Sequence, residues 1–377
     1  RLAGMRGAAM KMGQVLSMEG ADILPPEFTQ ALAILRDSAN TMPASQVRQV
    51  MSREYGKDWE SQFESFDFEP VAAASIGQVH RATSHDGRDL ALKIQYPGVA
   101  RSIDSDVDTM AMFMRVANIL PVEIDIDGIV EEAKTQLRQE ADYLVEARYL
   151  RDYRQLVSEN DEYLVPEVHE DLTTRHILAM DYVQGEPLEA LGEEGVDQET
   201  RDRVGTLLER LMFRELFEFH TMQTDPNFAN YLYRPQDGRI VLLDFGSTVT
   251  FEEAFTEKYR RISLALIEDD EDSIWRLAED IGYLHPDDSP AHAGRIVDLI
   301  KVICEPICQD REYDFAASDV TARARDAGME LAWKSQGELR TPPPETVFLH
   351  RKLVGSFLVC ARIKARLNVQ KLILEYL

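Results

Sequence analysis

The chain has 377 residues, and its 41 lysine and arginine side chains are outnumbered by 67 aspartates and glutamates, which gives a formal net charge of −26. This charge repels nucleic-acid phosphates and anionic lipid surfaces, so it argues against nucleic acid as a partner and against broad adsorption to membranes. The length is enough for two domains with cores of their own, and no uncharged apolar stretch reaches the roughly eighteen residues that a membrane-spanning helix needs.

Near the start of the chain, residues 8–18 (AAMKMGQVLSM) are rich in small residues and methionine. This pattern predicts a helix that buries one face, and its simplest interpretation is a helix packed on a core. Because the chain begins with Arg1 and not with Met, we expect it to be part of a longer chain, with any targeting or membrane segment upstream.

Residues 71–79 (VAAASIGQV) follow the pattern of the kinase glycine-rich loop, G-x-G-x-x-G-x-V. Gly77 and Val79 fall on its last two fixed positions, whereas Ala72 and Ala74 replace the first two glycines. Glycine lets backbone amides approach phosphates at φ values that cost alanine roughly 1 kcal/mol. We therefore expect this alanine-rich loop to hold a nucleotide differently from an ordinary kinase loop.

Residues 90–94 (LALKI) predict an apolar strand that contains one lysine, Lys93. The same arrangement occurs in the V-A-I-K strand of kinases, whose lysine holds the α and β phosphates of ATP. A lysine in an apolar strand is otherwise typical of a sheet edge, where its charge discourages pairing with other chains.

Apolar residues at helical intervals predict a long amphipathic helix at residues 129–150. It carries Glu140, Asp142 and Glu146, the candidates for the glutamate that pairs with the kinase lysine. Residues 96–127 form an insertion between the lysine strand and this helix. Acidic side chains on a helix are more often simply solvated. The helix alone therefore does not show whether one of these residues pairs with Lys93 or whether all three lie on a solvated face.

Residues 224–230 (TDPNFAN) and 242–246 (LLDFG) have the spacing of a kinase catalytic centre. Asp225 and Asn230 are five positions apart, as in H-R-D-x-x-x-x-N, and Asp244 begins an Asp-Phe-Gly nineteen residues after Asp225. Phosphoryl transfer needs one carboxylate near the attacking oxygen, and an amide and a second carboxylate on the metal ions that bridge the phosphates. The alternative is two surface turns that merely contain Asp and Asn.

Residues 231–245 (YLYRPQDGRIVLLDF) predict a hairpin, because apolar runs flank an Asp-Gly turn. After it the chain passes directly into an amphipathic helix predicted at 254–267, and no A-P-E sequence follows. Peptide kinases build their substrate platform from the segment that ends at A-P-E. Its absence from the sequence argues against ordinary protein phosphorylation.

Two further helices are predicted, at residues 295–308 and from Glu345 to the C-terminus. The last of these is apolar and basic at once (RKLVGSFLVCARIKARLNVQKLILEYL, 351–377). It suits a helix docked on the larger domain and, less well, a helix that lies on a membrane surface.

Taken in order, the motifs closely resemble those of the ABC1/UbiB/COQ8 family of atypical kinases, also called the AarF type. Five motifs over nearly the whole chain carry the resemblance: K-x-G-Q at 11–14, A-A-A-S at 72–75, E-x-D at 140–142, QTDPNFAN at 223–230 and LLDFG at 242–246. The resemblance implies an α+β, bilobal protein-kinase-like fold. Its parts would be an N-terminal helical extension (1–64), a small β-rich N-lobe with inserted helices (65–185) and a mostly helical C-lobe (186–377).

The resemblance also implies roles for individual residues. Lys93 would contact the phosphates and pair with Glu146, Asp225 would take the catalytic-loop position, and Asn230 and Asp244 would bind magnesium. The nucleotide would be held by Ala72, Ala73, Ala74, Ser75, Gly77, Val79, Lys93 and Asp244. Regulation would come from the N-terminal extension, which carries Lys11, Gly13 and Gln14 and covers the peptide site. Glu140 and Asp142 would hold the extension in place through contacts with Lys11.

The implied function is that of a Mg²⁺-dependent, ATP- or ADP-binding atypical kinase or ATPase that supports biosynthesis of ubiquinone or a related isoprenoid quinone. The implied partners are a lipid or quinone precursor and quinone-biosynthesis proteins, with peripheral membrane contact. The location would be the bacterial cytoplasm, including its membrane surface, or the matrix side of a mitochondrion. Two alternatives are a phosphotransferase acting on a small molecule or lipid, and a pseudokinase scaffold. The complete set of metal and phosphate residues weighs against the scaffold.

Overall fold

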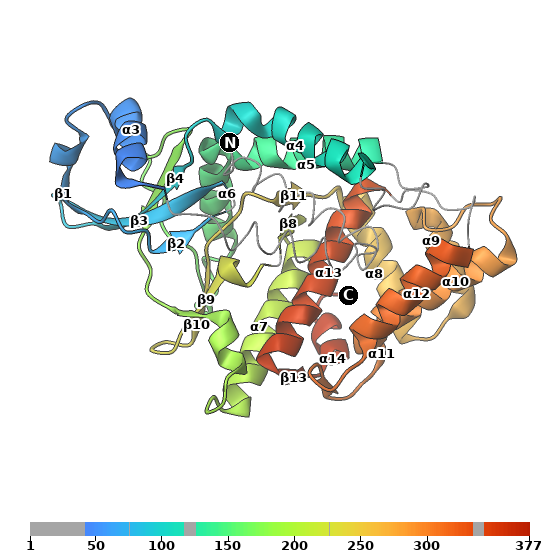
Figure 1. The fold of residues 1–377 in the computed structure, drawn as a ribbon. Helices are drawn as coiled ribbons and strands as arrows, with labels where there is room; N and C mark the ends of the chain where they lie inside the picture. Colours follow the sequence, from blue (N-terminus) through green and yellow to red (C-terminus); the bar gives the residue numbers. More distant parts are fainter. Residues whose placement is uncertain (1–41, 75, 117–125, 226, 335–342) are drawn as a thin grey trace. The chain divides into compact units, whose positions relative to one another are not determined.

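The computed structural model of the chain describes residues 42–74, 76–116, 126–225, 227–334 and 343–377 (Figure 1). These residues form two compact units. The first unit comprises the described residues up to Gln184 together with Val241–Ser247. The second comprises the described residues of Gly185–Ile240 and Thr248–Leu377.

The first unit is built on an antiparallel sheet with the order β1-β3-β4-β6, and β2 pairs with β3. The strands of the unit are β1 (Phe63–Phe66), β2 (Ala72–Ala73), β3 (Gly77–Ser84), β4 (Asp89–Gln95), β5 (Tyr163–Leu164) and β6 (Ile177–Asp181). The apolar strand predicted at 90–94 is confirmed as β4, which lies inside the sheet and is buried from Leu90 to Gln95. A strand buried on both faces explains why its sequence is almost continuously apolar.

The helices of the first unit are α3 (Ala44–Tyr55), the 3₁₀ turn η1 (Trp59–Gln62), α4 (Val99–Val116), α5 (Ile126–Glu140) and α6 (Tyr143–Leu156). Helices α4 and α5 pack side by side and contain most of the predicted insertion (Figure 1). The prediction of a single helix at 129–150 is wrong, because the helix is interrupted between α5, which ends at Glu140, and α6, which begins at Tyr143. Asp142 has an extended backbone at the break, and its side chain accepts a hydrogen bond from Leu144 N (3.2 Å) that caps α6.

The second unit is mostly helical. Its helices are η2 (Leu188–Gly192), α7 (Gln198–Phe217), η3 (Phe228–Asn230), α8 (Glu253–Ile267), α9 (Glu271–Ile281), α10 (Pro290–Ile303), α11 (Glu305–Cys308), α12 (Val320–Lys334), α13 (Pro344–Ile363) and α14 (Val369–Ile373). Its short strands are β7 (Glu186–Pro187), β8 (Thr221–Gln223), β9 (Tyr231–Arg234), β10 (Arg239–Leu242, which runs into the first unit), β11 (Thr248–Thr250), β12 (Tyr313–Asp314) and β13 (Arg366–Leu367). Helix α13 lies along α7 (Figure 1).

The hairpin predicted at 231–245 is confirmed by β9 and β10, and Gly238 forms its turn with a φ of +69°. The helix predicted at 254–267 is confirmed by α8. The helix predicted at 295–308 is interrupted at Cys304, where α10 ends and α11 begins. Pro306 accounts for the interruption, because proline has no N–H to bond to the carbonyl of Val302 four residues earlier and its ring clashes with that carbonyl, whereas proline is tolerated in the first turn of a new helix.

The helix predicted from Glu345 to the C-terminus ends early, at Ile363. Lys364 takes a left-handed backbone conformation (φ +60°), which turns the chain out of α13. The chain then forms β13, which pairs with β12, and the short helix α14. Among the residues that the structure describes, no helix combines the length and the hydropathy needed to cross a membrane.

Candidate functional site

Lys93 lies in the interior of the sheet of the first unit. In β4 it pairs with Val79 of β3 on one side and with Leu178 of β6 on the other, which excludes the interpretation as an edge-strand lysine. Its side chain is only 8% exposed, and a buried ammonium group needs charged partners. Two carboxylates provide them: Nζ lies 2.7 Å from Glu146 Oε1 and 2.7 Å from Asp244 Oδ2.

Glu146 reaches Lys93 from helix α6. The buried face of α6 repeats at helical intervals and consists of Tyr143, Glu146, Ala147, Leu150 and Tyr153. Glu146 therefore sits on the face that packs inward, one turn after the helix begins. The resemblance implied this pairing with Lys93, and the structure has the two residues in contact. The role of the pair on a nucleotide stays a prediction.

The three charged groups of this cluster shift one another's pKa values. Burial opposes the charged form of Lys93, but Asp244 and Glu146 outweigh that effect and raise the pKa of Lys93 well above its usual value. Burial raises the pKa of Glu146 to about 7, with the negative charge of Asp244 adding to the rise and Lys93 opposing it. Two carboxylates thus contact the same ammonium group.

Asp244 and Phe245 are fixed by their own short segment and by α6. The Phe245 ring is 1% exposed and its centroid lies 4.3 Å from that of Tyr153. Gly246 N donates to Asp244 Oδ1 (2.9 Å), which orients the carboxylate. The Asp244 side chain is 33% exposed, far more than Lys93 or Glu146, so it is the member of the cluster that solvent or a ligand can reach.

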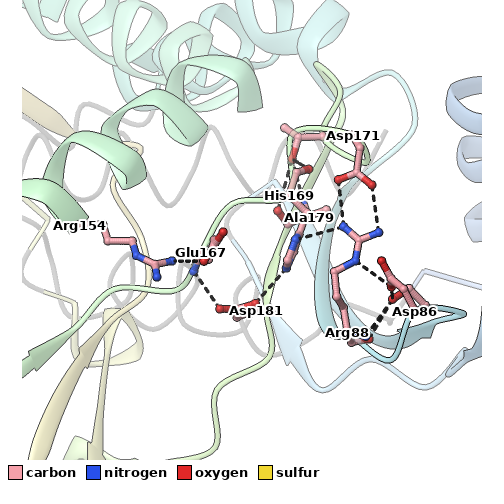
Figure 2. Close-up of polar contacts among 10 residues, drawn as sticks. Asp86, Arg88, Arg154, Glu167, His169, Asp171, Ala179 and Asp181 are labelled. Carbon is pink, nitrogen blue, oxygen red and sulfur yellow. Dashed lines mark hydrogen bonds and ion pairs between the residues drawn. The ribbon is translucent and has the colours of Figure 1, made fainter.

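A polar network on the surface of the first unit joins α6 to the sheet (Figure 2). Arg154 of α6 lies 2.9 Å from Glu167, whose backbone N–H donates to Asp181 Oδ2 at the end of β6 (3.2 Å). Arg88, from the β3–β4 turn, donates to His169 Nδ1 (3.3 Å), so His169 donates its Nε2 proton to Asp181 Oδ1 (2.9 Å). Each exposed contact contributes little alone, but together they tie the helix of Glu146 to the strands around Lys93.

The alanine-rich loop joins β2 to β3. Ala72 and Ala73 form β2, and Ala74 N donates to Gly77 O (2.9 Å) across the turn. None of these three alanines has a positive φ, so the backbone cost expected for alanine in place of glycine does not arise. Gly77 is required for another reason, because a Cβ there would lie 2.3 Å from the Ile94 carbonyl oxygen.

The second unit carries Asp225 and Asn230 between β8 and β9. Asn230 Nδ2 donates to the main-chain carbonyl of Asp225 (3.0 Å), so its amide oxygen is the atom suited to a cation. Gln223 Nε2 donates to the same carbonyl (2.8 Å). Asn230 is buried and Asp225 is half-buried. Residues 223–231 are called the Asp225 loop below.

Three residues outside the predicted motifs hold the Asp225 loop. Arg351 of α13 donates from Nε to Thr224 O (2.6 Å) and from Nη2 to Thr224 Oγ1 (2.7 Å). Glu215 of α7 accepts from Gln223 N (3.3 Å) and lies 3.0 Å from Lys352 Nζ. Helices α7 and α13, which are far apart in the sequence, thus together fix the start of the loop.

Several predicted residues have other contacts or lie beyond what is described. Lys11, Gly13, Gln14 and Ser75 are outside the described residues. Glu140 Oε1 accepts from Ser247 Oγ (3.3 Å), beside the Asp-Phe-Gly, and Asp142 caps α6 and lies 3.0 Å from Arg175 Nη2. The contact of Glu140 and Asp142 with Lys11 therefore stays a prediction. The domain boundaries at 64 and 185 stay predictions as well.

Each unit carries side-chain atoms of the kind that magnesium or phosphate prefers. Mg²⁺ prefers oxygen ligands, which the Asp244 carboxylate offers in the first unit and the Asn230 amide in the second. Lys93 offers a cation to phosphate. Tyr143 Oη is buried close to Gly77 and has no hydrogen-bond partner among the described residues, so it too is a donor or acceptor for a ligand at the alanine-rich loop.

Comparison with known families and proteins gives consistent results. A family model described as the ABC1 atypical kinase-like domain matches residues 34–278. The chain is 36% identical over 375 residues to the atypical kinase COQ8, mitochondrial, of Schizosaccharomyces pombe, covering 99% of this chain and 60% of that protein. It is 37% identical over 375 residues to the corresponding kinase of Saccharomyces cerevisiae, covering 100% of this chain and 74% of that protein. The chain thus spans well under the full length of these relatives.

Among solved structures, the chain is similar to Rv3197 of Mycobacterium tuberculosis, determined in complex with erythromycin. The TM-score is 0.70 with 26% sequence identity, over 97% of this chain and 90% of that one. Together with the family match, this similarity confirms the α+β, protein-kinase-like fold that the sequence predicts.

Proposed function

The chain belongs to the ABC1 atypical kinase-like family, and from this premise we propose that it is a Mg²⁺-dependent, nucleotide-binding kinase or ATPase that supports biosynthesis of ubiquinone or a related isoprenoid quinone. The observation that carries the proposal is Lys93 held between Glu146 and Asp244. In kinases the corresponding lysine contacts phosphates, the glutamate orients it, and the aspartate binds magnesium. The quinone pathway is inferred from the relatives, which are named COQ8 kinases.

Each residue would contribute a separate part of the chemistry. Bound magnesium would neutralise the phosphate charge that resists attack. Lys93 would hold the α and β phosphates, since Glu146 fixes its Nζ, and Asp244 and Asn230 would offer their side-chain oxygens to the metal. Asp225 would orient the attacking water or acceptor hydroxyl, near the start of the loop, which Arg351 and Glu215 fix.

The proposed acceptor is water or a lipid-like quinone precursor and not a peptide. Only residues 247–252 separate the Asp-Phe-Gly from α8, and three of them form β11. Peptide kinases need a longer segment in this place to build a substrate platform. A short, strand-paired connection suits a kinase that does not bind an extended peptide there.

The test is Mg²⁺-dependent phosphate release from ATP, measured with and without phospholipid vesicles, for the parent chain, Asp244→Asn and Asp237→Asn. Asp237 lies in the β9–β10 turn and provides the same chemical change outside the cluster. We expect Asp244→Asn to lower turnover about 10²- to 10³-fold, as loss of a transition-state charge contact does, and Asp237→Asn to leave it unchanged.

Two outcomes would contradict the proposal. Equal turnover by Asp244→Asn and the parent would show that the cluster takes no part in phosphate release. Tight binding of Mg²⁺-nucleotide with no phosphate release, in the presence of vesicles and of a quinone precursor, would favour the scaffold. Transfer of labelled phosphate to a lipid, in place of its release into water, would identify the lipid as the acceptor.

A further inference from the structure

The second unit contains a mostly apolar cavity of about 310 Å³. Side chains from α7, α8, α10, α12, α13 and α14 line it, among them Phe213, Ile262, Leu299 and Phe357. Its volume is about twice that of the roughly 150 Å³ cavity that holds one benzene molecule. It also reaches the lower end of the range for small-molecule sites in proteins, which are apolar with a few convergent polar groups.

Such polar groups are present in this cavity. Tyr259 Oη lies 2.7 Å from Tyr283 Oη, which is in turn hydrogen-bonded to His350 Nε2. His292 also lines the cavity and is 3% exposed, and its Nδ1 has no hydrogen-bond partner within the described part of the chain. A buried nitrogen without a partner is costly, and the polar atom of a ligand would satisfy it.

The lining selects against charged ligands. Lysine and arginine do not occur among the described residues that line the cavity, and its acidic residue is Asp288. Burial raises the pKa of Tyr259 to about 12 and lowers that of His350 to about 4, so both side chains are neutral near pH 7. An anion would enter without a counter-charge and would lose its hydration.

Helix α13 links the cavity to the Asp225 loop. Leu349, His350 and Leu353 line the cavity, while Arg351 of the same helix makes both hydrogen bonds to Thr224. Because packed helices move as rigid elements, a ligand that braces one side of α13 also restrains the loop on its other side.

We propose that this cavity is a binding site for a neutral, largely apolar molecule with a single hydrogen-bonding group, of the size of a medium-chain alcohol, and that α13 transmits its binding to the Asp225 loop. The binding step does not depend on the function proposed above. The two are therefore tested separately, one by ligand affinity and the other by phosphate release.

The test uses the full chain and two probes of equal length, 1-decanol and decanoate, in isothermal titration calorimetry at pH 7.5. The variant Leu299→Trp fills the cavity, and Leu358→Trp makes the same change at an exposed leucine of α13. We expect saturable 1:1 binding of 1-decanol, with decanoate at least about tenfold weaker. Leu299→Trp should abolish the binding and Leu358→Trp should retain it.

A second variant tests the polar contact. His292→Phe keeps an aromatic ring of similar size but removes Nδ1, so affinity for 1-decanol should fall about fivefold, the usual value of one hydrogen bond. Unchanged affinity in His292→Phe would contradict that contact. If Leu299→Trp does not fold, Ile300→Trp fills the same cavity from the same helix.

Amide hydrogen exchange measures the transmission to the loop without any reference to catalysis. With 1-decanol bound, exchange within residues 221–231 should slow in the parent and in Leu358→Trp, and stay unchanged in Leu299→Trp. Binding without any slowing would overturn the role of α13. The absence of saturable 1-decanol binding, or decanoate binding as tight as that of the alcohol, would overturn the site itself.

Discussion

Among the described residues, each unit of the molecule buries a lysine–glutamate pair, and the two pairs differ in their third partner. In the first unit Lys93 and Glu146 are 8% and 1% exposed, and the third partner is Asp244, at 33%. In the second unit Lys352 and Glu215 are 4% and 1% exposed, and Lys352 Nζ also donates to the buried hydroxyl of Tyr231 (3.2 Å).

The same kind of ion pair therefore suits two different purposes. The Lys93 pair has a second carboxylate, that of Asp244, which is partly exposed and can be reached by a metal ion. The Lys352 pair is balanced and closed, because burial raises the pKa of Tyr231 and keeps that side chain neutral. The first arrangement suits a ligand site, and the second suits a structural support for the Asp225 loop.

The largest effect on stability is expected from breaking the closed pair. Lys352→Met leaves Glu215 buried without its counter-charge, which should lower the free energy of unfolding by roughly 3–5 kcal/mol in a urea titration. Lys371→Met, at an exposed lysine of α14, makes the same change and should cost about 0.5 kcal/mol or less. Equal losses in the two variants would show that the buried pair has no special role.

A third buried glutamate makes the stability of the second unit depend on pH. Glu209 is fully buried and accepts from Cys360 Sγ (3.5 Å), and burial raises its pKa to about 7. Because this pKa is higher in the folded state than in the unfolded state, the stability it contributes is complete below about 4.5 and is lost as the pH rises through about 7.

Urea titrations between pH 5 and pH 8 measure this effect. The parent should lose roughly 3 kcal/mol relative to Glu209→Gln over that interval, because the glutamine has no proton to release. Parallel pH profiles for the two proteins would show that Glu209 is already ionised in the folded state at pH 5.

A smaller effect is expected at the start of the helix that carries Glu146. Asp142→Ala removes the cap of α6 and should lower the free energy of unfolding by about 1 kcal/mol. Asp142→Asn keeps an oxygen that caps the helix and removes the charge that faces Arg175. It should therefore lower the free energy of unfolding by only about 0.3 kcal/mol. Similar losses in both variants would assign the effect to charge and not to capping.

The first pair was only partly accessible to sequence reasoning. Lys93 lies in a strand with a recognisable motif, whereas Glu146 was one of three acidic candidates in a predicted helix and was singled out by the family resemblance alone. Lys93 interrupts an apolar strand, and the hairpin before Asp244 has an Asp-Gly turn, so local chemistry alone predicted β4, β9 and β10. The break at Asp142 was missed because apolar residues continue at helical intervals across it. Only the cap itself, an aspartate side chain bonded to Leu144 N, distinguishes two helices from one.

The second pair was missed because nothing in the local sequence separates it from surface charge. Arg351 and Lys352 lie next to one another in a basic, apolar helix, and their positions suited either a docked or a membrane-surface helix. The structure buries Lys352 against Glu215 and bonds Arg351 to Thr224, contacts between residues more than a hundred positions apart. Periodicity cannot predict such pairs, because they depend on how α7 and α13 pack.

We propose that the Lys93 pair, and not the closed one, belongs to the nucleotide site. The most direct measurement is the affinity for ADP with and without Mg²⁺, by calorimetry, for the parent, Asp244→Asn and Lys352→Met under conditions where all three are folded. Mg²⁺ should strengthen ADP binding at least about tenfold in the parent, by a smaller factor in Lys352→Met because the loop that carries Asn230 loses its support, and not at all in Asp244→Asn. An undiminished Mg²⁺ effect in Asp244→Asn would contradict the account.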